Sequence, residues 1–165
     1  MKRKITVIGA GNVGATIAYT LSLGDLASEI VVIDINKDKV EGEVMDIVQG
    51  TSFREPISVI AGDYADAVDS DMVIITSGIG RKPGQSRLEL VQTNVGIIKA
   101  ISSEIVKVAP NAIYILVANP VDILTYAFLK YTGLPKNQVF GTGTVLDTIR
   151  LRTRLAEIYN VNKQQ

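Results

Sequence analysis

Short β-branched runs alternate with longer amphipathic segments along the whole chain, and this alternation limits the possible folds more than any other feature. The apolar runs are continuous, which is typical of strands buried on both faces; they lie at 5–8, 30–33, 58–60, 72–75, 113–116 and 139–140. Helical spacing predicts helices at about 13–21, 37–49, 87–108, 121–131 and 144–159. The order indicates an α/β fold, a doubly wound parallel sheet with helices on both faces.

Composition excludes several classes of function. Lys plus Arg and Asp plus Glu each number 17, so no overall positive field would attract a nucleic acid or an anionic membrane. The chain has no cysteine, which removes disulfides and thiolate metal sites, and we expect no metal centre. It also has no histidine, the usual proton carrier near neutral pH. Since no run approaches the ~18 apolar residues of a membrane span, we expect a cytoplasmic protein.

The first expected strand leads directly into a glycine motif, Gly9-Ala10-Gly11-Asn12-Val13-Gly14. Its G-x-G-x-x-G spacing suits a tight turn at Gly9, the approach of a pyrophosphate at Gly11 and close helix packing at Gly14. Asp34 ends the second strand about 20 residues later, where a carboxylate would hold ribose hydroxyls and repel a 2′-phosphate. The context predicts NAD as cofactor and a Rossmann-type sheet of six strands in the order 3-2-1-4-5-6.

Two further segments follow expected strands at their carboxyl ends, where ligands bind in open parallel sheets. The first, 77–87, is long and irregular and carries the cations Arg81, Lys82 and Arg87, so it is a candidate lid. A solvated basic loop is the alternative interpretation of the same residues. The second is Asn119-Pro120, which either presents an amide to a ligand or simply forms a turn.

Two pairs at helical spacing are ambiguous. Asp147 and Arg150 lie three residues apart on the last expected helix, where such a pair is most often a surface ion pair. Tyr126 and Lys130 have the Tyr-x-x-x-Lys spacing of short-chain dehydrogenases. The glycine spacing of those enzymes differs from the one found here, so we interpret Tyr126 as a helix-packing residue and Lys130 as a solvated cation.

Taken together, these motifs resemble those of the lactate/malate dehydrogenase family over essentially the whole length. The matching segments, besides the glycine motif and Asp34, are Gly62-Asp63-Tyr64, Arg81-Lys82-Pro83-Gly84 with Ser86-Arg87, Asn119-Pro120-Val121-Asp122, and Gly141-Thr142-Gly143-Thr144 with Leu146, Asp147 and Arg150. The resemblance implies an NAD-dependent oxidoreductase that acts on a small 2-hydroxy or 2-keto acid and forms a homo-oligomer.

The resemblance also implies roles for single residues. Arg150 resembles the arginine that grips the substrate carboxylate, and Arg87 resembles the loop arginine that polarises the substrate carbonyl. Asn119 resembles the asparagine near the substrate oxygen and the nicotinamide ribose, and Asp147 resembles the acid that orients a catalytic histidine. The residues expected to contact the cofactor are Gly9, Gly11, Asn12, Val13, Gly14, Asp34, Ile35, Tyr64, Ser77, Gly78, Asn94, Val117 and Asn119.

Arg81 occupies the position associated with substrate choice in this family, where lactate dehydrogenases usually have glutamine and malate dehydrogenases arginine. A guanidinium can pair the second carboxylate of malate or oxaloacetate, whereas lactate would leave it unpaired. The residue therefore favours malate, with L-lactate dehydrogenase as the alternative. A methyltransferase that binds S-adenosylmethionine is a further alternative, but it gives Arg81 and the Asp147/Arg150 pair no evident role.

The family's proton-transferring histidine lies in a segment that would follow the last motif found here. We therefore expect residues 1–143 to form the dinucleotide-binding domain and 144–165 to form the first helix of a truncated catalytic domain. The 165 residues alone are then expected to be inactive. A non-catalytic dinucleotide-binding module is the other hypothesis for this polypeptide. Truncation would also expose apolar side chains on the last helix, which favours self-association.

Overall fold

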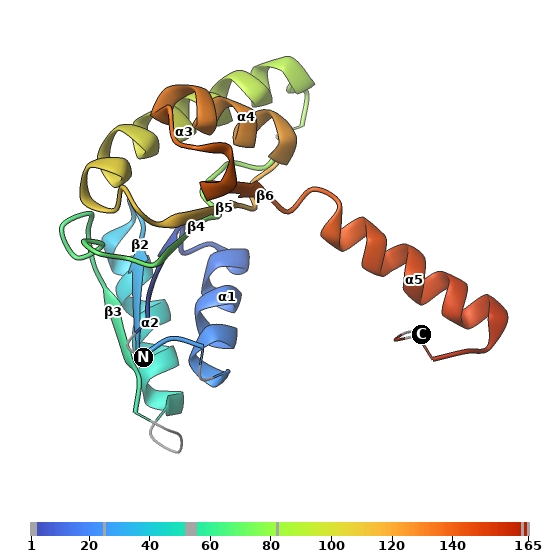
Figure 1. Cartoon of the computed structure of the whole chain (residues 1–165), viewed down its shortest axis with the longest axis horizontal. Helices are drawn as coiled ribbons and strands as arrows, with labels where there is room; N and C mark the ends of the chain where they lie inside the picture. Colours follow the sequence, from blue (N-terminus) through green and yellow to red (C-terminus); the bar gives the residue numbers. More distant parts are fainter. Residues whose placement is uncertain (1–2, 25, 52–55, 82, 163, 165) are drawn as a thin grey trace.

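The computed structural model describes residues 3–24, 26–51, 56–81, 83–162 and 164. In this part of the chain six parallel strands form one sheet in the order β3-β2-β1-β4-β5-β6, which confirms the predicted topology (Figure 1). The strands are β1 (Lys4–Ile8), β2 (Glu29–Ile33), β3 (Ser58–Ala61), β4 (Met72–Ile75), β5 (Ile113–Leu116) and β6 (Val139–Gly141).

The helices also lie where their spacing predicts. They are α1 (Asn12–Leu23), α2 (Lys37–Thr51), α3 (Arg87–Val108), α4 (Val121–Thr132) and α5 (Val145–Tyr159). A single turn of 3₁₀ helix, η1 (Lys136–Gln138), was not expected from the sequence; it begins after Pro135 and leads into β6. The long helix α3 begins at a capping box, in which Ser86 and Glu89 satisfy each other's backbone N–H groups.

Alternate side chains of the central strands enter two separate hydrophobic cores. Val31 and Ile33 of β2 face one core, which also contains apolar residues of α3 and α4. Ile30 and Val32 face the other core, formed with residues of α1 and α2. Because the period of a strand is two, this alternation means that one helix pair covers each face of the sheet. Both faces are therefore buried around the central strands, as the continuous apolar runs predicted.

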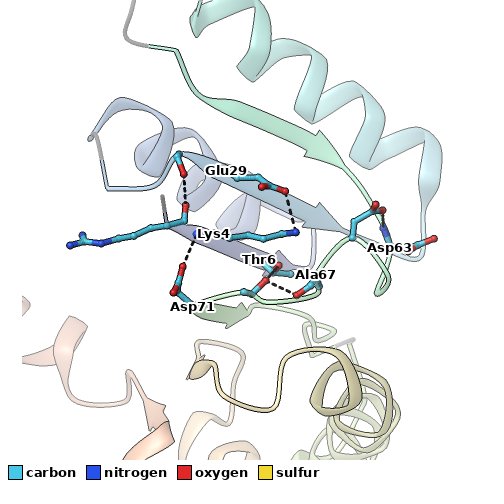
Figure 2. A network of polar contacts seen from close by, with 10 residues as sticks. Lys4, Thr6, Glu29, Asp63, Ala67 and Asp71 are labelled. Carbon is cyan, nitrogen blue, oxygen red and sulfur yellow. Dashed lines mark hydrogen bonds and ion pairs between the residues drawn. The ribbon is translucent and has the colours of Figure 1, made fainter. Parts of the chain in front are cut away.

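Polar side chains tie the amino-terminal ends of the strands together, at the edge where the strands begin (Figure 2). The Lys4 ammonium pairs with Glu29 at 3.1 Å, and the Lys4 backbone N–H donates to Asp71 at 2.8 Å. The buried hydroxyl of Thr6 lies 2.7 Å from that of Ser70, which in turn donates to a loop carbonyl. These contacts satisfy one another within the fold, so this edge has a structural role.

Helix α5 extends away from the sheet and its four companion helices (Figure 1). None of its residues is buried. Its exposed apolar side chains are Val145, Leu146, Ile149, Leu151, Leu155, Ile158 and Tyr159. Within the described residues, no helix combines the length and the apolar character that crossing a membrane would require.

Candidate dinucleotide-binding site

The glycine motif forms a sharp turn between β1 and α1 at the carboxyl edge of the sheet. Gly9 has a φ of +108°, a conformation that favours glycine, and its N–H donates to the carbonyl of Ile33 at 2.7 Å. A Cβ on Gly14 would overlap the carbonyl oxygen of Gly9 and lie 2.8 Å from Thr76 Oγ1. Gly14 therefore lets the first turn of α1 pack directly against the turn that precedes it.

Gly11 differs from its two neighbours in the motif because nothing in the fold requires a glycine there. A Cβ on Gly11 would meet no atom within 4 Å, and its φ of −74° suits any residue. Gly11 is also the N-cap of α1, which has no side-chain cap and no acidic residue in its first turn. Bare N–H groups at an uncapped helix start, beside an open glycine, fit the close approach of a pyrophosphate.

Asp34 and Thr76 reach the glycine turn from the strands on either side of β1. Asp34 follows β2 and accepts the N–H of Ala10 at 2.6 Å and that of Asn36 at 2.9 Å. Thr76 follows β4, and its Oγ1 lies 3.0 Å from the carbonyl oxygen of Gly9. The carboxylate predicted to hold the ribose is thus also bonded to the turn itself.

Asn94 joins the loop after β4 to the loop after β5. It lies on α3, is 1% exposed, and exchanges hydrogen bonds with the backbone of Ile79 at 2.9 and 3.2 Å. Its amide also donates to the carbonyl of Asn119 at 2.8 Å. Three of its four hydrogen-bonding positions are therefore used within the fold. Asn94, which the resemblance implies as a cofactor contact, thus also tethers the two loops from beneath.

A cleft of about 300 Å³ lies between the start of α1 and these two loops. Val13, Gly78, Val117 and Asn119, four of the predicted cofactor residues, line it together with Arg81. Two other lining residues, Ile79 and Gly80, belong to the segment 77–87 that the sequence predicts as a candidate lid. Sequence reasoning missed the remaining three, Thr76, Leu90 and Ala118. Each of them adjoins a predicted residue along the chain or lies one helical turn from Arg87, so proximity to the motifs was the available signal.

Three more predicted residues lie in different surroundings. Ile35 is fully exposed beside Asp34, as a residue at the open carboxyl edge can be. Ser77 directly precedes the cleft residue Gly78. Tyr64 is partly buried against the core on the α3 side, and this burial, with the charge of Glu104, raises the pKa of its hydroxyl.

The proposed substrate residues are not gathered in one place. Arg87 is the first residue of α3 and is exposed. Asp147 and Arg150 lie on the projecting helix α5 and pair with each other at 3.2 Å, both largely exposed. This matches the surface ion pair that their spacing favours. Lys82, the third cation expected in the loop, lies outside the described residues.

Tyr126 is not the packing residue that was expected. Its side chain is 63% exposed, and the ammonium of Lys130 lies 5.5 Å from the centre of its ring. The spacing of four residues places both side chains on the outer side of α4, where a cation–π contact holds them. The pair therefore forms a contact on the surface. Lys130 is an exposed cation, as predicted, whereas the prediction of Tyr126 as a helix-packing residue was wrong.

Comparisons with known proteins agree on one family. A family model described as the NAD-binding domain of lactate/malate dehydrogenases matches residues 3–141. An L-lactate dehydrogenase of Clostridium perfringens is 52% identical over 159 residues, which are 96% of this chain and 50% of that protein. L-lactate dehydrogenase 1 of Clostridium acetobutylicum is 54% identical and matches 96% of this chain and 51% of its own length.

A solved structure extends the likeness to three dimensions. The minor L-lactate dehydrogenase of Enterococcus mundtii, in its ligand-bound form, has a TM-score of 0.94 and 41% identity. The match covers 99% of this chain, so it includes α5, and 52% of that one. The chain therefore spans about half the length of the relatives it matches.

The fold and the glycine turn define a Rossmann-type domain that binds a dinucleotide. The family match identifies that dinucleotide as NAD. The chain belongs to the lactate/malate dehydrogenase family. This result confirms the resemblance drawn from the motifs and leaves the methyltransferase alternative without support.

Proposed function

We propose that this chain is the NAD-binding half of an L-lactate dehydrogenase. The observation that carries the proposal is the high identity, 52–54% over 96% of the chain, to relatives named as such. They favour the lactate alternative over the malate reading that Arg81 suggested. When bound, NAD accepts a hydride from the alcohol carbon of the substrate.

The chain's own residues would hold the two halves of the cofactor at the carboxyl edge of the sheet. The amides at the start of α1 would bind the pyrophosphate, and Asp34 would bind the adenosine ribose. Asn119 lines the cleft between α1 and the loop after β4, where it would contact the nicotinamide ribose and the substrate oxygen. Arg87 would reach the substrate carbonyl when the loop of residues 77–86 closes.

On α5, Arg150 would bind the substrate carboxylate and Asp147 would orient a histidine. In the structure these two side chains pair with each other. Because the exposed pair is weak, a carboxylate substrate can take the guanidinium from Asp147 at little cost. The 165 residues contain no histidine, so no imidazole among them can accept the alcohol proton near neutral pH. We expect NAD binding by these residues without turnover, and steady NADH production from lactate or malate would contradict this.

A malate activity is the second candidate, and Arg81 is the residue that favours it. Arg81 lines the cleft, and its Nε donates to the carbonyl of Gln85 at 2.9 Å, so the guanidinium is held at the loop. A dicarboxylate could pair such a charge, whereas lactate would leave it unpaired when the loop closed. The identity of 52–54% to relatives named L-lactate dehydrogenase is the reason why we still rank lactate first.

The ratio of kcat/KM for pyruvate to that for oxaloacetate, measured on the full product of the gene, decides between the two substrates. A ratio above one supports the lactate assignment, and a ratio below one replaces it with malate. Arg81→Gln should raise the ratio about tenfold or more, because it removes the charge that a second carboxylate would pair. Arg81→Lys is the matched control, since it keeps the charge and changes its geometry.

A further inference from the structure

The peptide group between Gly9 and Ala10 is held at both of its ends by side chains from neighbouring strands. Thr76 Oγ1 lies 3.0 Å from the carbonyl oxygen of this peptide, and Asp34 accepts its N–H at 2.6 Å. We propose that Thr76 and Asp34 form a clamp that fixes the direction of the pyrophosphate-binding amides. Both are then positioning residues for NAD. The inference rests on NAD binding at this turn and assigns the residues that make the turn competent.

The contacts around Ile8 show where the hydroxyl proton of Thr76 goes. Thr76 Oγ1 lies within reach of two carbonyl oxygens, that of Ile8 at 3.2 Å and that of Gly9 at 3.0 Å. The Ile8 oxygen already accepts the backbone N–H groups of Thr76 at 2.9 Å and Ser77 at 3.1 Å. Because a hydroxyl has one proton and a carbonyl two lone pairs, the proton is directed to Gly9.

The clamp is needed because a glycine at position 9 restricts the backbone little, so the peptide group that follows it has more than one possible orientation. A peptide group is planar, so its C=O and N–H point in opposite directions and turn together. Next to a glycine such a group can flip at little steric cost. A flip of the Gly9–Ala10 peptide would turn its carbonyl oxygen away from Gly14, against which it packs. In the binding mode proposed above, that oxygen would then face the pyrophosphate. With Thr76 on the oxygen and Asp34 on the N–H, only one orientation satisfies both.

Asp34 therefore has a second role beside its proposed contact with the ribose. One carboxylate oxygen accepts the N–H of Ala10 and the other accepts that of Asn36. An asparagine at this position has one accepting oxygen, so its NH₂ group would face one of these two amides. The substitution should weaken the binding of the phosphates as well as that of the ribose. A role confined to the ribose predicts no loss in the phosphate contribution.

The test compares two ligands by calorimetry, adenosine and ADP, on the chain as it exists. The ratio of the Kd for adenosine to the Kd for ADP measures what the diphosphate contributes. Thr76→Val, which replaces the hydroxyl by a methyl group, should lower this ratio about tenfold and change the Kd for adenosine less than twofold. Thr76→Ser keeps the hydroxyl and should stay within about threefold of the parent ratio. Asp34→Asn should weaken the binding of adenosine and also lower the ratio of the Kd for adenosine to the Kd for ADP.

The double variant tests whether the two residues act on one peptide. If they do, Thr76→Val combined with Asp34→Asn should lower the ratio little more than the stronger single change, because the peptide is released once. An unchanged ratio in Thr76→Val, or effects of the two changes that multiply, would overturn the clamp. If the unaltered chain binds neither ADP nor NAD, NAD binding itself has failed, so the two failures are distinguishable.

Amide hydrogen exchange on the unaltered chain needs no variant and covers the case in which a variant does not fold. In the absence of ligand, the Ala10 amide should exchange at least tenfold more slowly than the Gly11 amide one residue later, because Asp34 accepts the first. Adding ADP should then slow exchange at Gly11 and Asn12. Equal exchange rates at Ala10 and Gly11 before ligand is added would contradict the clamp.

Discussion

Two alanine substitutions in the glycine motif separate folding from binding. A Cβ at position 14 overlaps the carbonyl oxygen of Gly9, and this peptide group is held in its orientation by hydrogen bonds to Thr76 and Asp34. Overpacking of this kind costs about 3 kcal/mol, so Gly14→Ala should lower the Tm by roughly 6–12 °C. A Cβ at position 11 meets nothing, and its extended backbone suits alanine. Gly11→Ala stabilises the fold because alanine lowers the conformational entropy of the unfolded chain, and it destabilises the fold because alanine is a poorer N-cap residue than glycine. These two effects nearly cancel, so the free energy of unfolding should change by less than about 1 kcal/mol.

The affinity for NAD should depend on the substitution at Gly11 rather than on the packing at Gly14. A methyl group on Gly11 occupies the open space at the start of α1, where we place the pyrophosphate, so Gly11→Ala should raise the Kd at least about tenfold, or about 1.4 kcal/mol. Thermal unfolding followed by circular dichroism measures the first effect, and calorimetric titration with NAD measures the second. A Gly11→Ala variant that is stable and binds NAD like the parent would refute the placement of the pyrophosphate. A Gly14→Ala variant as stable as the parent would refute the packing argument.

Three other predictions concern the core, the loops and the surface of α5. Burial raises the pKa of Tyr114 to about 12, so between pH 10 and 12 the unfolded chain loses this proton first and stability falls. In urea titrations, the free energy of unfolding should fall less from pH 9 to pH 11.5 in Tyr114→Phe than in the parent, by about 2 kcal/mol. An equal fall in the two proteins would contradict the raised pKa of Tyr114. Asn94→Ala should cost about 3 kcal/mol because three hydrogen bonds are lost, and a cost below about 1 kcal/mol in the same titration would contradict the tether. Light scattering should give a mass above 17.8 kDa that Ile158→Lys on α5 lowers, whereas a monomeric parent chain would rule out association.

The elements of the fold could be predicted because each carries a strong local signal. The strands are unbroken β-branched runs, and their ends differ from the prediction by a residue or so, as in β1, which begins at Lys4. The glycine turn was equally readable, since the backbone at Gly9 and the packing at Gly14 constrain the residue type directly. Such signals lie within the segment itself and need no knowledge of distant contacts.

The roles of Asn94 and Thr76 could not be predicted in the same way. Each side chain bonds to backbone groups of other segments, with Asn94 reaching Asn119 and Thr76 reaching Gly9. Every residue has a backbone carbonyl, whatever its type, so the sequence does not indicate which carbonyl accepts a hydrogen bond from a distant side chain. Tyr126 illustrates a second limit, because an aromatic residue on an apolar-rich helix reads as core although it lies on the solvent side.

Calorimetric titration of the folded 165-residue chain with NAD tests the central claim most directly. The uncapped start of α1, the open Gly11 and the carboxylate of Asp34 predict one saturable site per chain, with a Kd that rises at least about tenfold in Gly11→Ala. Absence of any binding heat at several temperatures, in a chain that circular dichroism shows to be folded, would contradict the site and the roles proposed around it.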